Sequence, residues 1–214
     1  MKMPSDFSRE RILKLISEAG NKLPKTESTC EIPIVEIYKP ILPDAVTCFR
    51  NELELVNGKC FICEDETDLY TKLHSFVEQR KFSFLFCRDS YILNQLKAYE
   101  IPYSNQETDF EQMQAGITGC EFLVARTGSV LVSSDSESGR QMSVFPPVHI
   151  VLAHVSQLVD YPEEAYLAIQ KKYGDSLPSS VTTITGPSRT ADIEKTLVLG
   201  AHGPKEFLVF LCKE

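Results

Sequence analysis

The segment KCFICEDETDLYTKLHSFVEQRKFSFLFC, residues 59–87, decides the expected fold. Two short apolar runs, 59–63 and 82–87, flank a stretch at 67–80 in which apolar residues recur at helical spacing. Short apolar strands that alternate with helices are typical of a parallel sheet covered by helices. We therefore predict an α/β fold with an open, Rossmann-like sheet.

Further elements are expected on both sides of this segment. Helical patterns cover 44–55 and 90–99, so the alternation continues in both directions. From residue 116 the pattern changes to apolar runs that predict strands at 120–125, 128–133, 148–153, 181–185 and 206–211, with one helical pattern at 162–173. Because loops on a rigid scaffold commonly carry function, we expect the functional residues in this second half.

The first 43 residues differ from the rest. Residues 7–19 show the spacing of an amphipathic helix, and Gly20 is suited to end it. Four prolines between residues 21 and 43 indicate an extended connection, with one short strand at 34–38. We predict an N-terminal helical arm with a linker, 1–43, and one α/β domain, 44–214.

Composition excludes several classes of partner. The 214-residue chain carries a formal net charge of −8, and its basic residues are scattered, which disfavours nucleic acid and anionic membranes. No stretch approaches the roughly 20 apolar residues that span a bilayer, and the N-terminus lacks the apolar core of a secretion signal. Seven cysteines, an odd number, fit a reducing compartment. We expect a cytoplasmic protein without membrane insertion.

The segment TGPSRTADIE, 185–194, holds the densest group of candidate binding residues. A turn that leads Ser188, Arg189 and Thr190 into the start of a helix would gather backbone amides, hydroxyls and a guanidinium into an anion site. Alternatively, these hydroxyls cap the helix and Asp192 complements its dipole. The sequence leaves both interpretations open.

A second candidate segment is GITGCEFLVARTGS, 116–129, which is expected to form strand, turn and strand with a sharp reversal at Gly128. Glu121 beside the glycine turn is a candidate nucleophile or base. No motif supplies a base for Cys120, and the segment lacks the glycine fingerprints of nucleotide-binding loops. Nucleotide binding is therefore not predicted.

Histidines add two further candidates. His149 follows a double proline at the start of an expected strand, and His202 lies in a glycine-rich turn before the last strand. A structural role is favoured for His149, whereas for His202 a structural role and a role as acid or base are about equally favoured. No histidine pair has metal-ligand spacing, and Cys60 with Cys63 has no second pair, so no metal site is predicted.

Together these segments resemble the lactate-utilisation protein C family, also called the LUD domain. The likeness rests on 116–129, Gly139 with Arg140, 146–149, 177–179, 185–194 and GAHGP at 200–204, in this order. It implies a fold similar to the sugar-phosphate isomerase and CoA-transferase group, and a role in oxidising L-lactate to pyruvate beside iron–sulfur partner proteins. No cofactor is expected on this chain, because its cysteines lack the spacing that holds a cluster.

Three functions remain open at this point. In the first, the chain is a non-redox subunit that binds a small anion through Thr127, Gly128, Ser188, Arg189, Thr190, Asp192, His202 and Gly203. In the second, it is an independent transferase or isomerase for a phosphorylated or CoA-linked acid, with Glu121 or His202 performing the chemistry. In the third, it is a non-catalytic scaffold.

The sequence departs from the family pattern at Arg126, where an acidic residue is usual before the Thr-Gly pair. A carboxylate that was catalytic in relatives would be lost here. The exchange could also provide a cation for an anionic ligand, although arginine at a strand end is commonly a solvated side chain.

Overall fold

The computed structural model describes residues 4–20, 39–190 and 198–214. The chain divides into two compact units, Met1–Lys39 and Pro40–Glu214. The division expected from the sequence lies slightly later, after residue 43. In the first unit, helix α1 (Pro4–Gly20) exposes its apolar residues Ile12, Leu13, Leu15 and Ile16. The strand expected at 34–38 lies outside the described residues. Within the described ranges, no helix is both long and apolar enough to span a membrane.

The second unit is built on a parallel sheet of six strands. They are β1 (Lys59–Cys63), β2 (Leu85–Phe86), β3 (Tyr103–Ser104), β4 (Ala115–Thr118), β7 (Val148–His154) and β12 (Glu206–Cys212). Their order is β1-β12-β7-β4-β2-β3, and every neighbouring pair is parallel. The predicted α/β class with an open, Rossmann-like sheet is confirmed.

Three helices of this unit begin at an aspartate that the sequence places just before the helical pattern. They are α2 (Ala45–Leu55), α3 (Glu66–Arg80) and α4 (Ser90–Ala98). The carboxylates of Asp44, Asp65 and Asp89 accept hydrogen bonds from the backbone N–H groups of Thr47, Asp68 and Ile92. These caps satisfy donors that have no partner inside the helix, so each start is fixed locally.

A second sheet was not expected from the sequence. Its strands β5 (Phe122–Val124), β6 (Ser129–Ser133), β8 (Leu158–Val159) and β9 (Val181–Ile184) have the order β8-β5-β6-β9. Helix α5 (Pro162–Tyr173) packs on it, and β10 (Arg189–Thr190) pairs with β11 (Val198–Leu199). The 3-10 turns are η2 (Glu107–Gln112), η3 (Ala125–Thr127), η4 (Gln141–Ser143) and η5 (Val155–Gln157).

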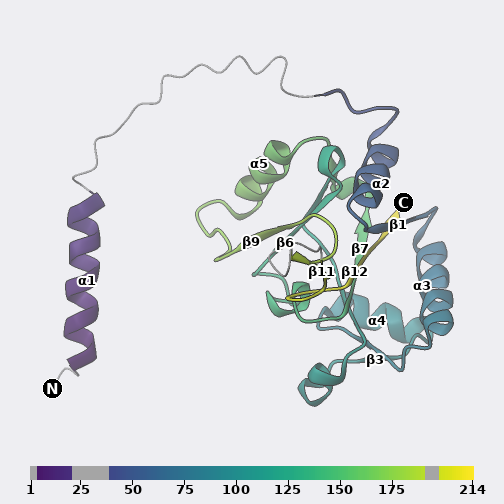
Figure 1. The fold of residues 1–214 in the computed structure, drawn as a ribbon, viewed down its shortest axis with the longest axis horizontal. Coiled ribbons are helices and arrows are strands. Elements are labelled where there is room, and N and C mark those ends of the chain that lie inside the picture. The colour runs from purple at the N-terminus through teal and green to yellow at the C-terminus, as the bar shows by residue number, and fades with distance from the viewer. Residues whose placement is uncertain (1–3, 21–38, 191–197) are drawn as a thin grey trace. The chain divides into compact units, whose positions relative to one another are not determined.

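Both faces of the parallel sheet are buried. Ile150 and Phe210 belong to a core shared with α3 and α4, whereas Val151 and Val209 belong to a core shared with α2, β5 and β6. In Figure 1, α3 and α4 lie on one side of β7 and β12, and β6, β9 and α5 lie on the other. Neighbouring residues of a strand point to opposite faces, so both cores need apolar residues from every central strand.

Two expectations about individual elements were wrong. Strand β4 was missed, and the strand expected at 120–125 starts only at Phe122, after a turn through Gly119. Arg189 and Thr190 form a short strand, and the helix expected to start after them lies outside the described residues. The glycines at 116 and 119 hide β4, because they interrupt the apolar pattern that marks a strand.

Gly128 is held against the backbone of α2. Its φ of +59° lies in the left-handed region, and a Cβ atom there would lie 2.6 Å from the carbonyl carbon of Glu52 and 2.7 Å from the Cα of Leu53. Gly139 has nearly the same φ, +60°, but a Cβ atom there would meet nothing within 4 Å. Alanine substitutions at these two glycines therefore separate the cost of left-handed strain from the cost of steric overlap.

We expect Gly128→Ala to lower the free energy of unfolding by about 3 kcal/mol, since left-handed strain and overlap with a backbone act together. Gly139→Ala, which adds only the strain, should cost about 1 kcal/mol. Urea unfolding of both variants measures the difference. Equal losses would show that the contact between Gly128 and α2 does not constrain the fold.

Candidate functional site

The parallel sheet has one position where ligands of α/β proteins usually bind. Strands β2 and β4 are neighbours, but the chain continues from β2 to β3 on one side and from β4 to β7 on the other. Such a divergence leaves a crevice at the carboxyl ends of the strands. A cavity of about 330 Å³ lies there, which we call the carboxyl-edge cavity, lined by Asp89, 119–121, 132–133, 135–138 and 172–173.

Glu121 is anchored in the wall of this cavity. Its side chain is 7% exposed and accepts hydrogen bonds from Ser133 Oγ (2.7 Å), Tyr173 Oη (2.6 Å) and Lys172 Nζ (2.6 Å). Burial alone would raise its pKa, but the hydrogen bonds from Lys172, Tyr173 and Ser133 outweigh it and hold the pKa below its ordinary value. Both oxygens are engaged, so Glu121 is a weak base that ties β6 and α5 to the turn after β4.

Cys120 also lines this cavity and a neighbouring hollow that reaches Tyr70 and His154. Burial raises the pKa of its thiol, with a smaller contribution from the charge of Glu121. A thiol attacks only as the thiolate, so the environment of Cys120 does not activate it. In the described part of the chain, no group of histidine, cysteine and acidic side chains is arranged to hold a metal ion.

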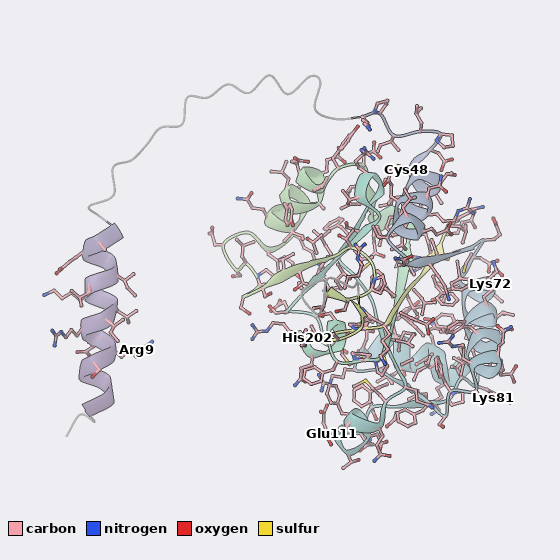
Figure 2. All side chains as sticks on the ribbon, viewed as in Figure 1. Arg9, Cys48, Lys72, Lys81, Glu111 and His202 are labelled. Atoms are coloured by element: carbon pink, nitrogen blue, oxygen red, sulfur yellow. The ribbon has the colours of Figure 1, made fainter. Side chains whose placement is uncertain are left out.

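A second hollow lies at the opposite edge of the sheet, where β7 and β12 begin. This amino-edge pocket has a volume of about 450 Å³ and is lined by 144–145, Pro147, 200–203 and Lys205. Figure 2 shows His202 in the loop between β11 and β12. Among the described residues, the lining contains an imidazole and an ammonium group but no carboxylate, which favours an anion over a cation.

Backbone hydrogen bonds join the two most specific segments of the sequence at this pocket. The N–H of Ser188 donates to the carbonyl of Pro204 (2.9 Å), and the N–H of Gly200 donates to the carbonyl of Ser188 (2.8 Å). A Cβ atom on Gly203 would lie 3.0 Å from that of Ser188, so the two loops are in close contact. His202 and Gly203 line this pocket, and Ser188 contacts Gly203 without belonging to the lining.

The other predicted ligand residues lie away from this lining. Arg189 and Thr190 pair with β11, and Arg189 is exposed. Thr127 Oγ1 accepts a hydrogen bond from Ser129 Oγ (2.8 Å), which also lies 2.8 Å from Thr185 Oγ1. Asp192 lies outside the described residues. Of the described positions, Thr127, Gly128, Arg189 and Thr190 line neither hollow described above.

Arg126 makes an intramolecular ion pair. Its Nη1 atom donates to Glu52 Oε1 of α2 at 3.0 Å, with both side chains partly exposed. The guanidinium is therefore engaged by a protein carboxylate. The hypothesis that it serves an anionic ligand is not supported by this contact.

Sequence reasoning overlooked Lys205, which lines the amino-edge pocket directly after the GAHGP segment. A Cβ atom on Gly200 would lie 3.0 Å from Lys205 Cβ, so the aliphatic part of the lysine side chain packs against this glycine. The φ of Gly200 is +72°. The position of Lys205 next to a glycine-rich turn was the available signal. A single surface lysine carries no pattern that marks it as a ligand residue.

His149 is a core residue and lines neither hollow. It is fully buried, its Nε2 atom lies 2.9 Å from Thr118 Oγ1, and its ring packs 5.3 Å from that of Phe207. Its Nδ1 atom has no hydrogen-bond partner among the described residues. Burial lowers the pKa of His149 to about 4, so the ring is neutral at physiological pH.

The fold is that of a Rossmann-like α/β protein with a hollow at each end of its central strands. The profile of the LUD domain family matches residues 46–212, and the chain belongs to this family.

The sequence of this chain is similar to the sequences of two bacterial proteins. A lactate utilization protein C of Bacillus licheniformis is 38% identical over 96 residues, which are 44% of this chain and 40% of that protein. An uncharacterized protein of Neisseria meningitidis serogroup B is 36% identical over 115 residues, 52% of this chain and 48% of that protein. The matches thus span less than half the length of these relatives.

Among solved structures, a DUF162 family protein from Deinococcus radiodurans has a TM-score of 0.60 at 15% identity, over 78% of this chain and 96% of that one. This likeness shows the shared fold alone.

The buried His149 predicts a pH dependence of stability. The pKa of its ring is about 4 in the folded chain and 6.5 in the unfolded chain. As the pH falls from 6.5 towards 4, the unfolded chain binds a proton that the folded chain does not, so this contribution to stability is lost. We expect it to lower the free energy of unfolding by about 2 kcal/mol between pH 7 and pH 5.

His149→Gln should remove this slope, because a glutamine does not titrate. The matched variant His74→Gln changes a partly exposed histidine and should keep the slope of the unmodified chain. Urea unfolding at both pH values measures each slope. A His149→Gln variant with the full slope would contradict the assignment.

Proposed function

We propose that this chain acts in lactate utilisation as a subunit without a redox group, and that it binds lactate or a related small carboxylate in the amino-edge pocket. The name of the relative in Bacillus licheniformis supports the process, and the charge of the pocket supports the class of ligand. The observation that carries the proposal is a pocket whose described lining holds a lysine and a histidine but no carboxylate, on a chain whose net charge is −8.

Backbone geometry supports an anion at this pocket. Within the described ranges, the N–H groups of Ala201, His202 and Gly203 meet no backbone acceptor. A turn with successive N–H groups after a left-handed glycine is the kind of concave site that binds carboxylates and phosphates. The side chain of Lys205 packs against Gly200 at the start of this turn, so its ammonium group can add positive charge to the same site.

Oxidation of lactate to pyruvate releases an electron pair, which needs an acceptor. The cysteines of this sequence lack cluster spacing, so the proposal assigns electron transfer to iron–sulfur partner proteins. Val144 and Phe145, both exposed at the rim of the pocket, provide apolar surface next to the proposed ligand. A partner that covered them would exclude water from the bound carboxylate.

The alternative of an independent transferase or isomerase has less support. Glu121 lies at the carboxyl edge of the sheet, whereas Ser188 lies at the amino edge, so the two cannot act on one small substrate. His202 remains the candidate acid or base beside the anion. A scaffold role fits the exposed rim but leaves the cationic pocket unexplained.

Replacing Lys205 tests the ligand site. We expect Lys205→Gln to weaken binding of L-lactate about tenfold, because a charge-assisted hydrogen bond is lost. Lys171→Gln removes an equal charge from an exposed position on α5 and should bind as the unmodified chain does. Calorimetric titration with L-lactate measures both. Equal affinities for the two variants would reject the pocket.

Growth tests the process independently of the ligand site. A strain that lacks this gene should fail to grow on L-lactate when its partner proteins are present, and the unmodified chain should restore growth. The double variant Lys205→Gln, His202→Ala should accumulate as a folded protein but not restore it. Growth of the deletion strain at the normal rate would reject the role in lactate utilisation.

A further inference from the structure

The carboxyl-edge cavity differs in charge from the sites that α/β proteins usually form there. Among the described residues, its lining includes the carboxylates of Asp89, Glu121, Asp135 and Glu137 and one cation, Lys172. Lys172 is paired with Glu121 at 2.6 Å, which leaves three carboxylates without a cationic partner in the lining. The cavity therefore repels anions and attracts cations.

The helix terminus that faces this edge is already occupied by carboxylates of the chain. Glu137 accepts hydrogen bonds from the backbone N–H (2.6 Å) and the hydroxyl (2.9 Å) of Ser90, the first residue of α4. Asp89 accepts from the N–H of Ile92. These are the donors that would bind a phosphate at a helix N-terminus, so a phosphorylated ligand finds neither free donors nor favourable charge.

A buried hydroxyl provides an independent indication of a ligand. Ser138 lines the cavity and is 4% exposed, yet its Oγ atom has no hydrogen-bond partner among the described residues. Leaving a buried hydroxyl unpaired costs free energy, and such groups need an explanation. A hydroxyl group of a ligand would supply the missing partner.

We infer that the carboxyl-edge cavity is a second binding site, for a small polyhydroxylated molecule that carries a protonated amine. The amine contacts Asp135, which is exposed and has no ion-pair partner among the described residues, and hydroxyls of the ligand pair with Ser138 and the neighbouring Ser136. The volume of about 330 Å³ fits a six-carbon chain. This inference goes beyond the proposed function and involves the opposite edge of the sheet.

Three probes with one carbon skeleton test the class of ligand. Glucamine, sorbitol and gluconate share a six-carbon polyol and end in an amine, an alcohol and a carboxylate. Titration of the full chain, followed by NMR of its backbone amides, should give affinities in the order glucamine, sorbitol, gluconate. The shifts should concentrate at 119–121 and 135–138. Absence of binding by glucamine, or tighter binding of gluconate, would overturn the inference.

Two variants test the residues. Asp135→Asn should weaken glucamine binding about threefold to fivefold and leave sorbitol binding unchanged, since only the charge is removed. Asp175→Asn removes an exposed carboxylate outside the lining and should change neither. Equal glucamine affinities for these two variants would overturn the assignment of Asp135.

Ser138→Ala should weaken both glucamine and sorbitol but should not lower the Tm, because the hydroxyl has no partner in the chain to lose. A lower Tm with unchanged binding would assign Ser138 to the fold and overturn its role as a ligand residue. None of these variants touches the amino-edge pocket, so titration with L-lactate should be unaffected in all of them. Failure of this inference is thereby distinguishable from failure of the proposed function.

Discussion

The adjacent strands β7 and β12 impose the constraint on which the rest of this structure depends. They pair in parallel over seven positions, from Glu206 with Val148 to Cys212 with His154, and their side chains alternate between two cores. A parallel sheet with two apolar faces must be covered on both. Here α3 and α4 cover one face, while α2 and the second sheet cover the other. Only the strand ends remain accessible, which is why both hollows lie at the edges of the sheet.

The sequence predicted this architecture where the signal is local. Regular apolar spacing located α2, α3 and α4 closely, because amphipathic packing acts within a few residues, and the aspartates that cap these helices fix their starts in the structure. Strand β4 was missed although it lies between β7 and β2, since Gly116 has no side chain and its strand is defined by neighbours far away in sequence. The second sheet was missed for a related reason. Short apolar runs such as β5 and β6 do not reveal which sheet they join.

At the candidate site, too, the sequence revealed the individual segments but not the contacts between them. The segments at 185–190 and 200–204 were recognisable by their residues, but their contact depends on backbone hydrogen bonds between Ser188, Gly200 and Pro204, which leave no mark in side-chain chemistry. Lys205 and Ser138 were overlooked because a lysine after a turn and a serine in a polar loop are common on protein surfaces. Their significance comes from what surrounds them in three dimensions.

The charges at the two edges are opposite, and this arrangement limits which ligand each edge can take. At the carboxyl edge, where α/β sheets usually bind anions, Glu137 and Asp89 occupy the start of α4. At the amino edge, Lys205 and His202 line a pocket to which the described part of the chain contributes no carboxylate. A net charge of −8 would weaken the attraction of any anion to the chain as a whole, so selectivity for a carboxylate must be local. The separation follows from the sequence of the loops, because the same parallel sheet supports both edges.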